Sequence, residues 1–278
     1  MKPPANVNVL NKRCEAIAGD VTASLRLRRV VAAIIVGQML PPSAIKGGTG
    51  LKLRLGHDRS RFSQDLDVAR RDGLIQFVDG FQARLTQGWG GFSGRLVELE
   101  PARPKGVPAE YIMRPYDVKL EYKGRSWITV LVEVGHDELG DTERPEKLIA
   151  QDLVALFESL GLQNPGPLAV VQVTHQIAQK IHALTAPDSQ RAHDLVDLQL
   201  LITSGVEIGV LVETVKRLFD YRRSHEWPPT VTPATDGTWA SLYREAAVGL
   251  PVLETVDSAV AWANNLINTL NLVLQAKP

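Results

Sequence analysis

Two aspartates separated by one residue, Asp65 and Asp67, are the side chains of this sequence best placed to do chemistry. Successive side chains of a β-strand point to opposite faces, so a strand over Phe62–Ala69 would project both carboxylates from one face while Leu66 and Val68 enter the core. Carboxylate oxygens are ligands that Mg²⁺ prefers, and the ion keeps its other positions for water and nucleotide phosphates. The pair therefore predicts a magnesium site that handles phosphates.

A glycine-rich stretch stands ahead of the two aspartates. Gly47, Gly48 and Gly50 would let backbone N–H groups approach a phosphate closely, and Thr49 adds a hydroxyl donor. No G-K-[ST] follows the glycines at the spacing of a Walker phosphate loop, so that class is excluded; a plain helix-entry turn stays open. Positive charge near the glycines and the acids comes from Lys46, Lys52, Arg54, Arg59 and Arg61. This order of groups is what a nucleotidyl-transfer site needs.

The stretches KGGTGLKL and RFSQDLDV resemble the first motifs of the AbiEii/AbiGii-type nucleotidyltransferase toxins, whose relatives include the mycobacterial tRNA-modifying toxins. Two later stretches look like the third and fourth motifs of that family. HQIAQKIHAL carries Lys180, and RAHDLVDLQLL carries Asp194. The four motifs occur in the expected order. His193 precedes the aspartate at a position that is often basic in relatives, so its charge would depend on pH.

The resemblance implies a toxin of a toxin–antitoxin system that transfers NMP from an NTP to an RNA end, the 3′ acceptor end of a tRNA, and releases pyrophosphate. It also implies a cognate antitoxin as a partner. In such a reaction Asp65 and Asp67 would hold Mg²⁺, and Lys52 and Lys180 would offset the charge that grows on pyrophosphate. The residues expected to bind the nucleotide are Gly47, Gly48, Thr49, Lys52 and Ser63.

A third metal-binding acid is expected on a strand beside the Asp65–Asp67 strand, because nucleotidyltransferase folds commonly use one. Glu133 in LVEV looks like that acid. Glu121 and Asp117 are alternatives, and a carboxylate that merely faces solvent from an edge strand is another.

The lysine and aspartate of the later motifs also have plainer interpretations. Lys180 lies on a helix with an apolar face, where a lysine often extends its stem along that face into water. Asp194 begins the next helix, where the helix dipole favours an acid in any protein, and Asp197 shares this ambiguity. We favour Lys180 as a catalytic residue and Asp194 over Asp197. His175 and His182 stand seven residues apart, too far for one zinc ion.

The element pattern predicts an α+β fold: a nucleotidyltransferase-like lobe over residues 1–165, with a mixed β-sheet and N-terminal helices, and a C-terminal helical lobe over 166–278 that contributes Lys180 and Asp194. Helices are expected over Val9–Ala18, Ala23–Gln38, Leu74–Leu85, and on both sides of APDSQ within Gln176–Leu201. Strands are expected at Ile45, Asp65–Val68, Tyr116–Tyr122 and Trp127–Val134, with a hairpin turn at Lys123–Arg125. Loops are expected over Glu100–Ala109 and Glu226–Gly237.

Composition excludes several classes of protein. The chain has 278 residues, 44% of them hydrophobic, and a formal net charge of zero, which disfavours indiscriminate nucleic-acid binding. A local basic rim would still suit a tRNA end. Its candidate residues are Arg54, Arg59, Arg61, Arg70 and Arg71. The alternative is that these arginines are scattered over the surface and solvated. The single Cys14 agrees with a reducing cytoplasm. The apolar run Val30–Leu40 is too short to span a membrane and predicts a buried helix that ends near Pro41.

Two other functions share these motifs. A small-molecule nucleotidyltransferase of the antibiotic-modifying kind would keep the glycine turn and the acid pair but would lack a basic surface that fits RNA. A non-catalytic binding module would keep the fold alone, and the intact Asp65 and Asp67 argue against it.

Overall fold

The chain forms two compact units in a computed structural model that describes residues 1–102, 112–235 and 237–276. Unit 1 contains Met1–His57 and Phe62–Val171, and unit 2 contains Asp58–Arg61 and Gln172–Pro278. The short segment Asp58–Arg61 therefore packs with unit 2 although unit 1 precedes and follows it in the chain. Much of the expected loop over Glu100–Ala109 lies outside the described residues.

A seven-stranded mixed sheet, counted over the described residues, organises unit 1 in the order β3-β4-β5-β2-β1-β7-β6. At its centre, β2 pairs with β5 in parallel and with β1 antiparallel. A sheet that mixes both orientations was expected from the sequence. The strands are β1 (Ser43–Ile45), β2 (Leu66–Arg70), β3 (Phe92–Glu98), β4 (Arg114–Tyr122), β5 (Arg125–Gly135), β6 (Glu146–Leu148) and β7 (Leu168–Val170).

Strands β4 and β5 form the predicted hairpin. Its two turn residues, Lys123 and Gly124, have φ angles of 50° and 70°. Two successive positive φ angles are those of a type I′ turn, whose twist matches that of the flanking strands. Tyr122 pairs with Arg125 directly across this turn. The hairpin fixes the register of β5 and so the position of Glu133 eight residues later.

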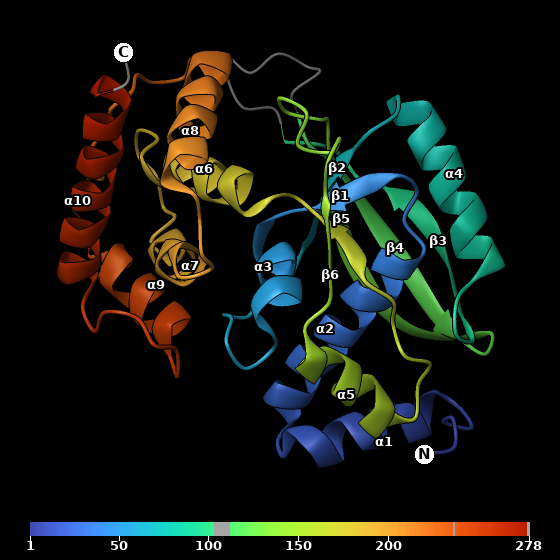
Figure 1. Ribbon diagram of the computed structural model, residues 1–278. Helices are drawn as coiled ribbons and strands as arrows, with labels where there is room; N and C mark the ends of the chain where they lie inside the picture. The colour runs from blue at the N-terminus through green and yellow to red at the C-terminus, as the bar shows by residue number, and fades with distance from the viewer. Residues whose placement is uncertain (103–111, 236, 277–278) are drawn as a thin grey trace. The chain divides into compact units, whose positions relative to one another are not determined.

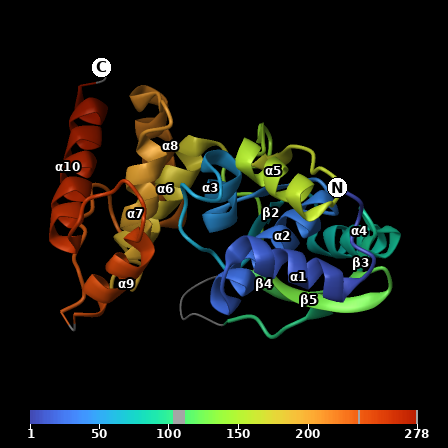
Figure 2. The same cartoon turned by 90° about the horizontal axis from the view of Figure 1, so that it is seen from below.

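Five helices of unit 1 accompany the sheet within the described residues. They are α1 (Val7–Ala18), α2 (Val21–Gln38), α3 (Gly47–Leu55), α4 (Leu74–Gln87) and α5 (Gln151–Leu160). The side chains of Asn6 and Asp20 accept hydrogen bonds from the backbone N–H groups of Val9 and Ala23, at 3.1 and 2.8 Å, so both N-terminal helices start on a capping residue. Each starts two residues earlier than predicted. Figure 2 shows α1 and α2 packed along β5.

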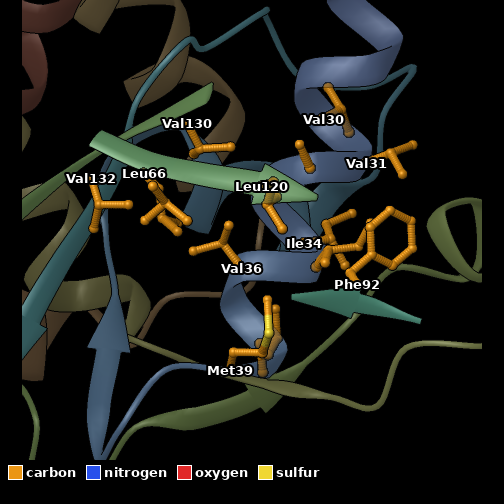
Figure 3. Close-up of a cluster of buried hydrophobic side chains, with 14 of the residues drawn as sticks. Val30, Val31, Ile34, Val36, Met39, Leu66, Phe92, Leu120, Val130 and Val132 are labelled. Atoms are coloured by element: carbon orange, nitrogen blue, oxygen red, sulfur yellow. The ribbon is translucent and has the colours of Figure 1, made fainter. Parts of the chain in front are cut away.

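The core of unit 1 lies between α2 and the sheet. The apolar run that begins at Val30 is buried through Gly37, and α2 ends at Gln38, as expected ahead of Pro41. Figure 3 shows side chains of this helix against those of β2, β4 and β5. No described helix is both long enough and apolar enough to cross a membrane.

Unit 2 is helical apart from the segment Asp58–Arg61, its turns and the long connection before α9. Its helices are α6 (Val173–Leu184), α7 (His193–Ile202), α8 (Ile208–Arg222), α9 (Thr238–Ala247) and α10 (Val256–Gln275). Helices α8 and α10 lie side by side in both views (Figures 1 and 2). A helical C-terminal half was predicted, and it begins after β7, which still belongs to the sheet.

Five elements of unit 1 were not assigned from the sequence, one of them helix α3, for which only an entry turn was considered. Strands β6 and β7 have three residues each, too few for a period to show. Strand β3 carries Gly94 and two charged residues, and it is buried fully only at Phe92. Helix α5 has a clear apolar face, with Leu153, Phe157 and Leu160 buried, and the pattern would have permitted its assignment.

Candidate active site

The glycine-rich stretch is the first turn of helix α3. The N–H of Gly50 donates to the carbonyl of Lys46 at 3.1 Å, so the N–H groups of the three residues between them precede the first intrahelical bond. The side chain of Lys46, at the cap position, makes no capping hydrogen bond. The start of a helix is a ready anion-binding site, because these N–H groups and the helix dipole both favour negative charge. The backbone N–H groups of Gly47 and Gly48 therefore lie at a helix start, where a phosphate could accept hydrogen bonds from them.

Gly47 brings the start of α3 against Asp67. Its φ angle is 63°, in the left-handed region, and a Cβ atom at this position would lie 1.8 Å from Oδ2 of Asp67. The backbone N–H of Lys46 also donates to the carbonyl of Asp67 at 2.9 Å. Only glycine fits this contact, since any side chain would displace the carboxylate. Helix start and acid are thus neighbours within unit 1.

Asp67 faces Glu133 across two parallel strands, as paired positions of β2 and β5. Burial raises the pKa of Glu133, and the charges of Asp67 and Asp65 and a hydrogen bond with Asp67 raise it further, while Lys46 opposes this. Burial and Asp67 likewise raise the pKa of Asp65, with Arg29 acting in the opposite direction. Asp65 lies just before β2, not within a strand from Phe62. The three acids therefore share one region of negative potential.

The other two acids considered for the third position lie elsewhere on β4. Asp117 forms an ion pair with Lys119 at 2.7 Å, and Glu121 pairs with Ser126 near the hairpin turn. Glu133 is the one whose strand partner is Asp67. The register between β2 and β5 thus distinguishes acids that looked equivalent in the sequence.

No three His, Cys, Asp or Glu side chains within the described residues are already arranged as metal ligands. The chemistry of Asp65, Asp67 and Glu133 nevertheless fits a hard divalent cation, because all their donors are carboxylate oxygens, and burial and the neighbouring acids raise the pKa of Asp65 and of Glu133. A cation between them would relieve the repulsion that now favours protons.

Three of the residues expected to bind nucleotide line one small hollow of about 10 Å³: Thr49, Lys52 and Ser63. The hydroxyl of Thr49 donates to the carbonyl of Asp65 at 3.0 Å, so it braces the chain ahead of β2. Lys52 is buried and donates to the carbonyl of His57 at 3.5 Å. The hollow has room for about one water molecule, so it could not hold a triphosphate as it stands.

Positive charge near the acids comes partly from residues that the sequence analysis did not single out. Arg29 on α2 donates to the side chain of Gln64 at 3.0 Å and lowers the pKa of Asp65. Arg26, one turn earlier on α2, lies 5.4 Å from the ring centre of Phe62. Arg54, which was counted as part of a basic rim, instead forms an ion pair with Glu146. In the sequence, the cluster of arginines in LRLRR, residues 25–29, could have indicated this positive charge.

Asp141 is a further residue near this site that was not singled out in the sequence. Burial raises its pKa to about 7, although Lys46 and the backbone N–H of Glu138 lower it. That N–H donates to Oδ1 of Asp141 at 3.1 Å. Leu139, between them, has a φ angle of 59°, unusual for a branched residue and typical of a tightly determined loop. In the sequence, Asp141 belongs to a group of acidic residues after a strand, and nothing in that pattern indicates that its side chain is buried.

Lys180 and Asp194 lie together in unit 2, buried in an ion network. Nζ of Lys180 donates to Asp194 at 2.8 Å and to Asp197 at 2.5 Å. Lys180 is 6% exposed and both aspartates are fully buried, so this is not a surface lysine. Burial alone would lower the pKa of Lys180, but the two carboxylates outweigh it and the pKa is raised.

Asp194 and Asp197 are not alternatives, since each binds cations of this network. Arg191 donates to Asp194 at 2.6 Å, and Arg61 donates to both oxygens of Asp197 at 2.9 Å. Burial would raise the pKa of Asp194, but Lys180 and Arg191 hold it below its ordinary value. Burial lowers the pKa of His193, with Asp194 acting in the opposite direction.

The sequence of this chain matches the model of a protein family described as "Nucleotidyl transferase AbiEii toxin, Type IV TA system" over residues 29–264. The chain belongs to this family. The AbiEii-family protein is thus a nucleotidyltransferase toxin, and membership of a type IV toxin–antitoxin family implies an antitoxin as partner. A comparison with curated proteins found no match.

Several solved structures are similar to this chain. The nucleotidyltransferase toxin MenT4 of Mycobacterium tuberculosis H37Rv is 19% identical, with a TM-score of 0.55 over 95% of this chain and 98% of its own. A putative nucleotidyltransferase from Helicobacter pylori is 16% identical, with a TM-score of 0.47 over 90% of this chain and 96% of its own. JHP933 of H. pylori is 17% identical, with a TM-score of 0.45 over 90% and 93%. The MenT4 likeness identifies a nucleotidyltransferase toxin fold.

Proposed function

We propose that this toxin transfers a nucleoside monophosphate from an NTP to the 3′ acceptor end of tRNA, with Mg²⁺ as the cofactor and pyrophosphate as the second product. The observation that carries the proposal is the pairing of Asp67 with Glu133 beside the start of α3, where Gly47 contacts Asp67. An acid pair that binds a cation and a helix start that binds an anion are the two halves of an NTP site.

The residues of unit 1 divide the work of this reaction. Asp65, Asp67 and Glu133 would hold Mg²⁺, which when bound neutralises phosphate charge. The N–H groups of Gly47 and Gly48 would orient the phosphates of the NTP. One carboxylate of this cluster would accept the proton of the attacking hydroxyl.

A polyanionic acceptor fits the basic half of α2. Arg26 is exposed and lies over the ring of Phe62, and Arg29 lies beside Gln64, next in the chain to Asp65. Lys and Arg clusters are what phosphate backbones require, and an antibiotic-sized acceptor would not need them. For this reason we propose RNA, and not a small molecule, as the acceptor.

The test is transfer of label from each of the four α-³²P NTPs to purified tRNA, with MgCl₂ or with EDTA. Matched arms contain tRNA whose 3′-terminal ribose has been oxidised by periodate, or a metabolite extract without RNA. We expect label on intact tRNA only with Mg²⁺, and none for Asp65→Asn with Asp67→Asn. Equal labelling of oxidised tRNA would disprove 3′ addition, and label only in metabolites would indicate a small-molecule acceptor.

A further inference from the structure

Arg61 stands at an unusual place in the chain. It belongs to the segment Asp58–Arg61, which packs with unit 2, while Phe62 begins the return to unit 1. Asp65 follows four residues after Arg61, and Asp67 follows two residues later. The chain that leads into the catalytic acids therefore leaves unit 2 at Arg61.

The contact that holds Arg61 is specific in geometry. Nε and Nη2 of its guanidinium donate to the two oxygens of Asp197 at 2.9 Å each. This is the two-bond fork that arginine forms with a carboxylate and that lysine cannot reproduce. The side chain of Arg61 is 15% exposed and Asp197 is fully buried, so water competes little with the pair.

Lys180 and Asp194 support this pair. Lys180 bridges the two aspartates at 2.8 and 2.5 Å, and Oδ1 of Asp194 lies 4.0 Å from Nη2 of Arg61. Two buried carboxylates would repel each other without the ammonium between them. The lysine and aspartate of the later motifs thus stabilise the carboxylate that binds Arg61, and two acceptors already engage Nζ of Lys180.

We propose that Arg61 is a positioning residue for nucleotidyl transfer, held by Asp197, and that Lys180 and Asp194 act through this contact. The inference rests on the proposed function. Arg61 touches no reacting atom in this role; it restricts the conformations of residues 62–67 that carry Asp65 and Asp67. Misplacement of a reacting group by about 1 Å can slow a reaction on the order of 100-fold.

The experiment compares wild type with Arg61→Ala and with Arg217→Ala, an exposed arginine of helix α8 in the same unit. Label transfer, NTP affinity, thermal unfolding and hydrogen exchange of residues 62–67 are measured on the same preparations. For Arg61→Ala we expect kcat to fall roughly 10- to 100-fold, with little change in the KM for NTP and faster exchange over 62–67. Arg217→Ala should resemble wild type.

Chemical rescue separates positioning from general loss of structure. Millimolar guanidinium chloride should restore several-fold activity to Arg61→Ala, because guanidinium can refill the site on Asp197. Urea, which has a similar shape and no charge, should restore none. Guanidinium should fail with Asp197→Asn. Equal effects of guanidinium and urea, or full kcat in folded Arg61→Ala, would overturn the inference.

A second variant covers the case in which Arg61→Ala does not fold. Arg61→Lys keeps the charge and loses the fork, so kcat should fall while NTP affinity stays near that of wild type; an unchanged kcat would overturn the inference. Absence of transfer by wild type would refute the proposed function instead. In that case hydrogen exchange alone tests the inference. Faster exchange of residues 62–67 in the folded Arg61 variant than in Arg217→Ala supports positioning, and equal exchange contradicts it.

Discussion

Asp67 and Glu133 occupy paired positions on the parallel strands β2 and β5, and burial together with the charge of Asp67 raises the pKa of Glu133. Their proximity, together with that of Asp65, therefore costs stability whenever all three are ionised. A site of this kind gives up stability for the ability to bind a cation, as functional sites commonly do.

The first prediction concerns this repulsion. The pKa of Glu133 is raised, so its contribution to stability is present below its ordinary pKa and is lost as pH rises through the higher folded value. Without divalent cations, Glu133→Gln should therefore raise the melting temperature at pH 8 and change it little at pH 4. Transfer activity should fall at least about 100-fold, since even outer-shell partners of metal ligands contribute about 10- to 100-fold.

Differential scanning fluorimetry with EDTA or MgCl₂ measures both effects of Glu133→Gln. Glu121→Gln, on the neighbouring strand β4, is the matched control and should behave as wild type. Added Mg²⁺ should stabilise wild type and leave Glu133→Gln nearly unchanged. A destabilised Glu133→Gln in EDTA at pH 8 would show that the carboxylate is structurally required.

The second prediction concerns the contact between Gly47 and Asp67. A methyl group at Gly47 would lie 1.8 Å from Oδ2 of Asp67 and overlap it. The alanine backbone would also have to adopt the left-handed φ of 63°. Gly47→Ala should lose transfer activity, because the carboxylate must move. Gly19→Ala is the control, since its φ is also positive at 82° and no atom lies within 4 Å of the added carbon.

Both glycine variants should lose about 1–2 kcal/mol of unfolding free energy from backbone strain, measured by urea denaturation. Gly47→Ala alone should lose more than that and lose activity as well. Wild-type activity in Gly47→Ala would mean that Asp67 does not need its present position against α3.

Sequence reasoning located the acid pair because the period of a strand is local. Asp65 and Asp67 share a face in any extended segment, whatever the rest of the fold does. It could not choose Glu133 over Asp117, because that choice depends on the register between β2 and β5, which are separated by more than fifty residues of chain. It recognised the glycines and left a helix-entry turn open, and the structure shows that helix α3 begins at Gly47.

The role of Lys180 depended on partners that no local pattern reveals. Asp194 and Asp197 lie on the next helix, and Arg61 joins them across 136 positions of sequence. A lysine on an amphipathic helix looks the same whether it reaches water or a buried carboxylate. The family motifs marked Lys180 and Asp194 as important, and the structure shows what they contact.

The third prediction distinguishes buried from exposed lysines. Lys180→Met leaves two fully buried carboxylates with less compensation, so it should lower the unfolding free energy by about 3–5 kcal/mol. Lys216, which forms an exposed ion pair with Asp220 four residues later, provides the control. Lys216→Met should change the unfolding free energy by only about 0–1 kcal/mol. Urea denaturation at pH 7 measures both, and an inactive Lys180→Met of wild-type stability would argue that Lys180 acts directly on the substrate.

The last prediction concerns acid sensitivity of unit 2, where hydrogen bonds connect two histidines. Arg222 can only donate, and it lies 3.2 Å from Nδ1 of His182, so Nε2 of His182 carries the hydrogen. That nitrogen lies 3.0 Å from the hydroxyl of Ser224, which in turn lies 3.0 Å from Nδ1 of His225. Nε2 of His225 then donates to Thr185 at 2.9 Å. This order of donors requires both imidazoles to be neutral.

Burial and Arg222 lower the pKa of His225. A histidine with a lowered folded pKa binds protons more readily when unfolded, so stability is complete above the unfolded value of about 6.5 and falls as the pH drops below it. The urea midpoint of wild type should therefore fall between pH 7.5 and 5.5, and that of His225→Gln should fall less. His136→Gln, in unit 1, should show the wild-type fall. Equal falls for wild type and His225→Gln would assign the acid sensitivity to other groups, because removal of the imidazole must remove its share of the proton uptake on unfolding.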